Sequence, residues 1–324
     1  MTAGDWRPRA SLRLLRMRAE VLARIRAFFA EAGVLEVETP ILSRAAVTAP
    51  ELASLRTRFH GPGPAAGPCY LQTSPEFPMK RLLAAGSGSI YQLCKVFRDG
   101  ERGRRHHPEF SLLEWYRVGW TWDALMDEVE ALLGRLCPPW RPPPVCARIS
   151  YRNLFLHHTG VDGLEPAVAP WQDCLQRAGI QVEGLPADDA APWRDLVLTH
   201  LIEPRLEGAL FVYDYPPEQA ALARVEGEPP VARRFELYLD GIELANGYQE
   251  LTDAAEQARR FARERAERRR QGLAEVPADE RLLAALAAGL PECAGVALGL
   301  DRLLMYLARL DRIDQVLAFP LERA

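Results

Sequence analysis

The sequence predicts an α+β fold in which an antiparallel sheet is flanked by helices. Two hairpin patterns predict the sheet. SIYQLCKVF (89–97) and FSLLEWYRV (110–118) have strand character and flank a short polar loop. Asp240-Gly241, between FELYL and IELANGY, is a strong two-residue turn signal of type I′. Amphipathic stretches before and between these patterns predict the flanking helices.

The first predicted helix runs from about Ser11 to Ala32, with leucine, isoleucine and phenylalanine spaced along one face. Gly33 stops this helix, and the segment VLEVET follows it. A second helix, TWDALMDEVEALLGRL (121–136), begins with Thr121 as its N-cap. Both helices have an apolar side that can pack on the sheet.

A third helix is predicted over DAAEQARRFARERAERRRQG (253–272), which holds seven arginines and four acidic residues. We expect a solvated face that is stabilised by the i,i+4 pairs Glu256–Arg260 and Glu264–Arg268. The alternative is an electrostatic docking surface for an acidic protein.

The segment CPPWRPPPVC (137–146) is a connector, because proline fits neither a helix interior nor a central strand. The residues that follow it have the pattern of mixed helices and loops and carry no chemical signature. Residues 147–230 are therefore treated as a less-defined insertion.

Composition disfavours several classes of protein. The net charge of −4 argues against nucleic-acid binding, since phosphate contacts dominate such affinity. No apolar run approaches the roughly 20 residues that span a bilayer, and the N-terminus lacks the apolar h-region of a secretory signal. The six cysteines are scattered without a CxxC pair, so we expect reduced thiols. These features predict a cytoplasmic globular protein with no membrane partner.

The arginine-rich loop within FRDGERGRRHHPEFSLLEWY (97–116) is the most informative stretch. A hairpin can aim its cationic side chains at one polyanion, which suits phosphoryl or nucleotidyl transfer because charge builds up in the transition state. The alternative is an exposed basic hairpin. The side chains expected to converge are Arg98, Glu101, Arg104, Arg105 and His106, with Glu114 and Tyr116 on the returning strand.

The Asp-Gly turn sets a register in which Tyr238 faces Glu243. Glu236 lies two residues from Tyr238 on the same face, so Glu236 and Glu243 are diagonal neighbours roughly 7 Å apart. Two such carboxylates can share magnesium ions on ATP phosphates; the alternative is a solvated hairpin face. Glu250 would lie on the opposite face of a regular strand, so we expect a bulge at Asn246-Gly247 to return it to this side.

Two further stretches carry candidate site residues. Ser74-Pro75-Glu76 reads as a fixed loop, in which proline restricts the backbone and aims Glu76. GVALGLDRLLM (295–305) reads as a strand followed by a helix. Gly299 allows close approach of a nucleotide, and Arg302 near the helix N-terminus can meet phosphates. The alternative is that Arg302 is an arginine of an ordinary amphipathic helix.

Three ordered segments resemble the motifs of class II aminoacyl-tRNA synthetases, in their lysyl version. VLEVETPIL (34–42) resembles motif 1, residues 97–116 resemble motif 2, and residues 295–305 resemble motif 3. The resemblance covers the chain from about residue 12 to the C-terminus. It is strongest to the truncated lysyl-tRNA synthetase paralogues that modify elongation factor P.

This resemblance implies a single class II catalytic domain over residues 1–324, with an antiparallel sheet of about six or seven strands. It also implies a homodimer built on the first helix and the strand after it. Only about ten residues precede that helix. An N-terminal OB domain that reads an anticodon is therefore not expected, and tRNA is not the expected partner.

The activity that the resemblance implies is that of an ATP-dependent ligase that also uses Mg²⁺. It would activate lysine or (R)-β-lysine as an aminoacyl-adenylate and transfer it to the ε-amine of a lysine on elongation factor P. Two alternatives stay open: an enzyme that charges tRNA or a small molecule, and a catalytically silent regulatory paralogue. The intact arginines and glutamates favour an active enzyme.

Site residues are carried over from matching motif positions. The expected catalytic residues are Arg98, Glu243 and Arg302, and the expected magnesium ligands are Glu236 and Glu243. ATP binding is assigned to Arg98, Asp99, Gly100, His106, His107, Glu243, Leu244, Gly299 and Arg302. Amino-acid binding is assigned to Ser74, Pro75, Glu76, Tyr116, Asn246 and Glu250, with Glu114 as a further carboxylate.

Four positions depart from the family pattern. Gly100 stands where relatives usually have a glutamate that contacts adenine, and Glu101 beside it is the expected substitute. His107 replaces a common asparagine, and Pro78 replaces a histidine or a larger side chain. Ala297 stands where lysyl-tRNA synthetases usually have glycine, and its methyl group is expected to favour the shifted amine of β-lysine.

Overall fold

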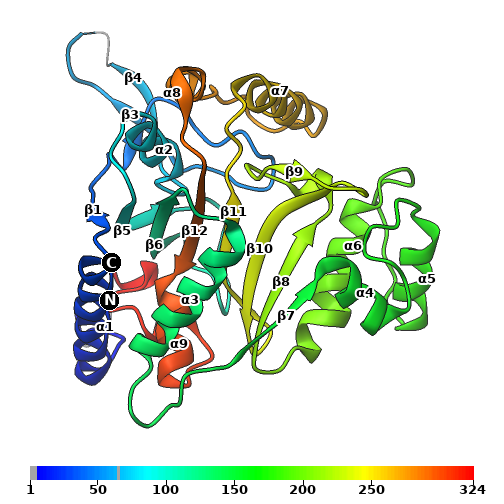
Figure 1. Ribbon diagram of the computed structural model, residues 1–324, viewed down its shortest axis with the longest axis horizontal. Helices are drawn as coiled ribbons and strands as arrows, with labels where there is room; N and C mark the ends of the chain where they lie inside the picture. Colours follow the sequence, from blue (N-terminus) through cyan, green and yellow to red (C-terminus); the bar gives the residue numbers. More distant parts are fainter. Residues whose placement is uncertain (1–5, 64–65) are drawn as a thin grey trace.

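The computed structural model describes residues 6–63 and 66–324, and a large sheet runs through it (Figure 1). Within the described residues this sheet has nine strands, in the order β1-β5-β6-β12-β11-β10-β8-β7, with β9 paired to β10. Pairings from β5 to β8 are antiparallel, whereas β1/β5 and β7/β8 are parallel. The strands are β1 (Leu35–Glu36), β5 (Ile90–Phe97), β6 (Glu109–Val118), β7 (Cys146–Ser150), β8 (Ala209–Tyr215), β9 (Val225–Glu226), β10 (Val231–Leu239), β11 (Ile242–Gln249) and β12 (Cys293–Gly299).

The predicted α+β fold with a mostly antiparallel sheet is confirmed, but the sheet is wider than expected. The extra width comes from β7, β8 and β9, which lie in or at the edge of residues 147–230. A second sheet of three short strands has the order β2-β4-β3. Its strands are β2 (Leu42–Ser43), β3 (Arg56–Phe59) and β4 (Gly67–Leu71).

One face of the large sheet is covered by three helices, α1 (Leu12–Glu31), α3 (Trp122–Leu136) and α9 (Leu300–Ala308). The first two confirm the predicted helices, and Ser11 caps α1 by accepting from the Leu14 N–H. Alternate residues of β6 and β12 point into this core, namely Leu113, Trp115, Val296 and Leu298. Because side chains alternate along a strand, the intervening residues face the other side.

The insertion builds a core of its own on the edge of the sheet. Its helices are α4 (Tyr151–Thr159), α5 (Ala169–Arg177) and α6 (Ala191–Val197). Tyr151, Phe155 and Trp171 are fully buried there. Figure 1 places these helices beside β7 and β8, away from α1. In the described part of the chain no helix has the length and apolar composition needed to cross a bilayer.

The remaining helices are α2 (Glu76–Ala84), α7 (Ala254–Arg270) and α8 (Glu280–Gly289). In α7 the predicted Glu256–Arg260 pair forms, at 3.0 Å. The predicted Glu264–Arg268 pair is wrong. Arg268 is buried and donates to the carbonyls of Ala49 and Ala274, so it ties α7 to two loops.

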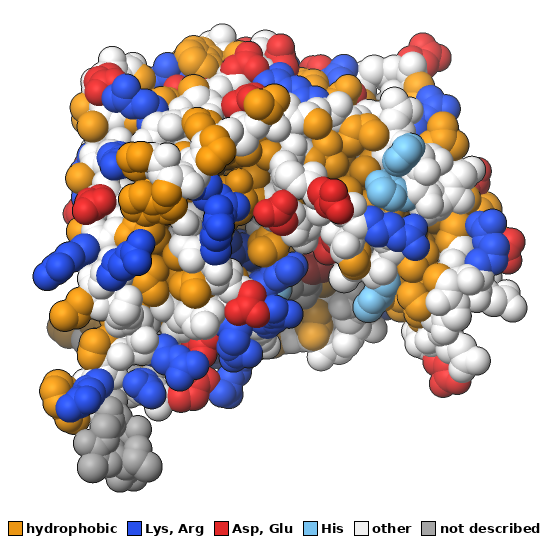
Figure 2. Space-filling view, turned by 90° about the horizontal axis from the view of Figure 1, so that it is seen from below, with side chains coloured by type: hydrophobic (Ala, Val, Ile, Leu, Met, Phe, Trp, Pro, Cys, Tyr) orange, Lys and Arg blue, Asp and Glu red, His pale blue; other side chains and the backbone are white. Residues whose placement is uncertain are grey.

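Charges of both signs are interspersed on the surface. On the face in Figure 2, acidic side chains lie among the arginines. Along α7, Glu256 pairs with Arg259, Arg260 and Arg263, and Glu267 pairs with Arg270. The predicted solvated face with close-range pairs is therefore present on this helix. All six cysteines are free in the structure.

Candidate active site

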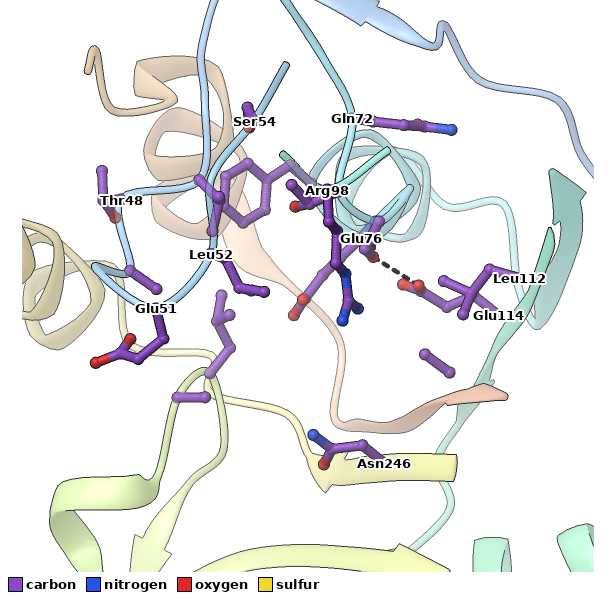
Figure 3. Close-up of a pocket in the computed structure, with 18 of the residues that line it drawn as sticks. Thr48, Glu51, Leu52, Ser54, Gln72, Glu76, Arg98, Leu112, Glu114 and Asn246 are labelled. Carbon is purple, nitrogen blue, oxygen red and sulfur yellow. Dashed lines mark hydrogen bonds between the residues drawn. The ribbon is translucent and has the colours of Figure 1, made fainter. Parts of the chain in front are cut away.

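The uncovered face of the sheet forms the floor of a cavity of about 1230 Å³. Sites for drug-sized ligands occupy about 300–1,000 Å³, so this cavity has room for a nucleotide and an amino acid together. A loop over residues 48–54 bounds one side, and Glu76, Arg98 and Glu114 lie around the centre (Figure 3). Residues 217–219 of the insertion line another part of the wall.

Strand register explains which side chains reach the cavity. Directly paired residues of neighbouring strands point to the same face. Two rows of such pairs cross β6, β12, β11 and β10. The first row is Glu114, Ala297, Asn246 and Glu236, and the second row is Tyr116, Gly295, Tyr248 and Arg234.

The hairpin of β10 and β11 has the predicted register. Asp240 and Gly241 both have positive φ, 48° and 69°, as a type I′ turn requires. Tyr238 pairs with Glu243, so Glu236 and Glu243 lie on one face and both line the cavity.

The predicted bulge exists but its position was wrong. Leu237 pairs with Ala245 while Tyr238 pairs with Glu243, so the extra residue is Leu244. Gly247 pairs regularly and is needed for packing, because a Cβ there would lie 2.4 Å from Cζ of Phe235. The consequence that was predicted still holds: Glu243, Asn246 and Glu250 all reach the cavity.

Three carboxylates converge at one end of the cavity, from Glu76, Glu114 and Glu250. Glu114 is 2% exposed, and its oxygens accept from Ser74 Oγ and from the Tyr116 hydroxyl, each at 2.6 Å. Burial and the neighbouring Glu76 raise the pKa of Glu114 to about 8. Burial likewise raises the pKa of Glu250 to about 7. Such a site suits a ligand with two ammonium groups, since buried cations need anionic partners.

Glu76 is held differently from the prediction. The expected loop ends at Pro75, which is the N-cap of α2, and Glu76 is the first residue of the helix. Proline suits a helix start because its missing N–H has no intrahelical partner there. One turn further along the helix, Lys80 pairs with Glu76 at 2.6 Å. Sequence reasoning missed Lys80, although the i,i+4 spacing would have indicated the pair once Glu76 was placed on a helix.

The other end of the cavity gathers the expected phosphate-binding groups. Arg302, the third residue of α9, donates to the Glu243 carbonyl at 2.7 Å and lies 3.3 Å from its carboxylate. The Nη2 atom of Arg302 lies 2.8 Å from Nε2 of His106. Burial and the nearby Arg302 charge lower the pKa of His106, which favours a neutral imidazole. Arg98 lies over the Phe110 ring at 5.0 Å and faces Glu101 at 3.5 Å.

Several predicted residues do not line the cavity. Asp99 and Gly100 are exposed in the turn after β5, where the Asp99 N–H donates to Ala53 and ties this turn to the loop. Arg104 pairs with Asp311 and does not join the arginines at the cavity. His107 reaches the cavity wall, but its Nε2 accepts from the Leu321 N–H. The cavity lining does include Ser74, Glu101, Arg105, Leu244 and Gly299.

Glu236 and Glu243 differ in how they could hold Mg²⁺. Glu243 is 41% exposed and has Arg302 beside it. Glu236 is buried, and its carboxylate accepts from the Tyr215 and Tyr238 hydroxyls at 2.7 and 2.6 Å and also from Arg234. Mg²⁺ in ATP-dependent enzymes is typically held by one or two carboxylates together with substrate phosphates. Glu243 is therefore the accessible candidate ligand, whereas both oxygens of Glu236 already accept from protein donors.

Replacing Glu114 by glutamine is expected to stabilise the fold, and increasingly so as the pH rises. Because the pKa of Glu114 is raised in the folded state, the folded protein loses stability as the pH rises from the unfolded-state pKa, near 4.5, to the folded-state pKa of about 8. Glutamine does not ionise, and the Ser74 and Tyr116 hydroxyls can reorient around its amide. We expect the difference in free energy of unfolding, variant minus parent, to be larger at pH 9 than at pH 5 by on the order of 2–4 kcal/mol. Thermal unfolding across this range measures it, and a pH-independent difference would contradict it.

Comparison with known proteins identifies the family of this chain. The family model of class II tRNA synthetases (D, K and N) matches residues 3–323. The chain is 49% identical to the elongation factor P–(R)-β-lysine ligase of Vibrio cholerae, with all of both chains covered. It is 46% identical to the ligase of the same name from Pectobacterium atrosepticum, over 99% of this chain and 98% of the relative. The Vibrio vulnificus ligase is 47% identical, over 98% of each chain.

Proposed function

Since this chain belongs to the class II tRNA synthetases of the D, K and N family, we propose that it activates lysine or (R)-β-lysine with ATP and transfers it to a lysine of elongation factor P. The buried cluster of Glu76, Glu114 and Glu250 is the observation that supports a diamino-acid substrate. The acceptor is proposed from the names of the relatives that match over the full chain.

In the first half-reaction the substrate carboxylate attacks the α-phosphorus of ATP, an aminoacyl-adenylate forms and pyrophosphate leaves. Arg98 neutralises charge on the α-phosphate, and Arg302 with His106 steadies the leaving pyrophosphate. Mg²⁺ on Glu236 and Glu243 would supply further neutralisation of the phosphates. Positioning and fixed charges accomplish this step, and no covalent enzyme intermediate is required.

The carboxylate cluster orients the substrate for that attack. Its two ammonium groups occupy the end of the cavity at Glu76, Glu114 and Glu250, so its carboxylate is directed along the sheet towards Arg98. In the second half-reaction the deprotonated ε-amine of the acceptor lysine attacks the adenylate carbonyl, and AMP leaves. An amide bond then joins the amino acid to the acceptor protein.

ATP–pyrophosphate exchange with lysine or (R)-β-lysine tests the activation step. Transfer of labelled amino acid to purified elongation factor P, with tRNA in a parallel reaction, tests the acceptor. Label on the protein alone supports the proposal. Label on tRNA would favour the charging enzyme instead, and absence of exchange with either amino acid would favour a silent paralogue.

Ala297 is proposed to set the preference between the two isomers. It lines the cavity between Asn246 and Glu114, to which it is paired on the neighbouring strands. One methyl group in a pocket is worth roughly 1–3 kcal/mol of discrimination. Ala297→Gly is therefore expected to shift relative activation towards α-lysine by about 10-fold. An unchanged ratio of kcat/KM values for the two isomers would refute this role.

A homodimer and a cytoplasmic location are also part of the proposal. Leu35, Ile41, Leu42 and Phe59 are 55%, 39%, 44% and 42% exposed, and they lie on or near the segment that resembles motif 1. Exposed apolar side chains that form a contiguous patch are typical of a protein interface. Sedimentation equilibrium decides between monomer and dimer. ATP and a translation elongation factor are both supplied in the cytoplasm.

A further inference from the structure

Lys80 is a buried cation immediately behind the amino-acid site. Its side chain is 1% exposed, and Nζ lies 2.6 Å from Oε1 of Glu76 and 2.6 Å from Oε2 of Glu250. Both glutamates line the cavity, whereas Lys80 is not among the described residues that line it. The lysine therefore approaches the two carboxylates from the side away from the substrate.

The two carboxylates come from separate elements and need a fixed relation. Glu76 begins α2, and Glu250 directly follows β11. Oε1 of Glu250 lies over Gly295, where an added Cβ would be only 2.3 Å away. The Glu250 carboxylate therefore lies with Oε2 next to the Lys80 ammonium group and Oε1 next to this glycine.

Charge balance gives Lys80 a second consequence. In the site without substrate the pKa of Glu114 is about 8, so this carboxyl holds a proton at neutral pH. When two ammonium groups bind, all three carboxylates can be ionised, and Lys80 then reduces their summed charge from −3 to −2. A diamino acid whose carboxylate is joined to AMP has two ammonium groups, so the site and the adenylate match. Without the lysine, three buried carboxylates would face two ammonium groups, and one of them would hold a proton.

We propose that Lys80 is a positioning residue of the amino-acid site, which holds Glu76 and Glu250 in their substrate-binding arrangement. This role rests on the proposed function, because it assumes a substrate with two ammonium groups. Lys80 touches the carboxylates and not the reacting atoms.

Composition supports a specific need for lysine here. The chain has 38 arginines and only two lysines, Lys80 and Lys95. Arginine carries a planar fork that matches one carboxylate in two contacts. Lysine carries a compact charge with three donors, which suits two carboxylates on different elements. In this arginine-rich chain, the position between Glu76 and Glu250 is one of the two that hold an ammonium group.

The pH dependence of Glu250 reports this role. Glu250 faces Lys80 and Glu76 on α2, Glu114 and Tyr116 on β6, and Cys293 on β12, with Tyr248 on its own strand. Of these groups Lys80 is the one that favours the ionised carboxylate. The paired carboxylates outweigh burial and raise the pKa of Lys80, so it stays charged. Loss of Lys80 therefore raises the pKa of Glu250 further.

Lys80→Met tests the proposal by pyrophosphate exchange with lysine from pH 6 to pH 9. We expect kcat/KM for lysine to fall about 10- to 100-fold at pH 7, mainly through KM. The acid limb of that profile should move up by at least about one pH unit, with KM for ATP little changed. A fall that is equal at every pH would mean that Lys80 only supports the fold, and would overturn the proposal.

Thermal unfolding at pH 6 and pH 8.5 gives a second measurement that needs no activity. A carboxyl whose pKa is raised in the folded state makes the protein less stable as the pH rises. The free energy of unfolding of Lys80→Met should therefore fall further below that of the parent at pH 8.5 than at pH 6. Equal loss at both values would also overturn the proposal. Lys95→Met is the matched control, because Lys95 is 44% exposed and pairs with Glu109 at 3.5 Å. In this variant neither the acid limb of the kcat/KM profile nor the pH dependence of stability should differ from the parent.

The parent enzyme separates the two hypotheses. One outcome is that the parent catalyses exchange with lysine or β-lysine while Lys80→Met keeps the parent's acid limb and the parent's pH dependence of stability. In that case the role proposed for Lys80 is wrong and the proposed function stands. If the parent exchanges with neither diamino acid, both are wrong.

Discussion

Replacing Glu243 by glutamine is expected to lower ATP–pyrophosphate exchange by at least about 100-fold while the fold is kept. The carboxylate is 41% exposed, so its change to an amide leaves no buried group without a partner. The backbone bond from Arg302 to the Glu243 carbonyl, at 2.7 Å, does not depend on the side chain. What is lost is a negative charge at the place where Mg²⁺ and the ATP phosphates are expected to meet.

Exchange should be measured over a range of Mg²⁺ concentrations, because loss of a ligand raises the concentration needed for half-maximal rate. Glu226→Gln is a matched control. Glu226 is 43% exposed and pairs with Arg224 and Arg233, and none of these three is among the described residues that line the cavity. Near-parent exchange by a folded Glu243→Gln protein would refute the magnesium assignment.

The register of the β10–β11 hairpin could be predicted because a two-residue Asp-Gly turn leaves little freedom. Positive φ at both turn positions fixes which residues pair, and Tyr238 and Glu243 followed directly. The bulge was misplaced because a glycine within a strand has two physical causes. Gly247 leaves room for the Phe235 ring, and that contact is tertiary, so the local pattern did not reveal it.

Contacts between distant segments account for the other misses. Arg104 was expected at the phosphates, but its partner Asp311 comes from the C-terminal part of the chain. Lys80 was not identified as a site residue, since its second partner, Glu250, lies on another element. Strands β7 and β8 were not predicted within the insertion because its helices and these strands share one core, in which the rings of Tyr151 and Tyr215 lie 4.8 Å apart at a tilt of 49°. Local periodicity does not encode such pairings.

Gly295→Ala is expected to lower kcat/KM for the amino acid by about 100-fold while KM for ATP changes little. A Cβ at this position would lie 2.3 Å from Oε1 of Glu250 and 2.4 Å from Cε1 of Tyr116. Neither side chain can withdraw easily: Glu250 is 1% exposed and held by Lys80, and Tyr116 is 2% exposed and donates to Glu114. The methyl group therefore displaces the groups that hold the substrate's ammonium ions, and a displacement of about 1 Å can cost 100-fold in rate.

Gly299→Ala, four residues along the same strand, separates this effect from a general loss of packing. Its Cβ would meet Leu244 and Arg302 at 3.7 to 3.9 Å, an ordinary contact, so the variant should fold normally. If Gly299 lies under the nucleotide, this variant raises KM for ATP and leaves KM for the amino acid unchanged. The two glycines would then divide the floor of the cavity into an amino-acid end and a nucleotide end. Parent-like lysine activation by a folded Gly295→Ala protein would show that the substrate does not lie against Glu250 and Tyr116.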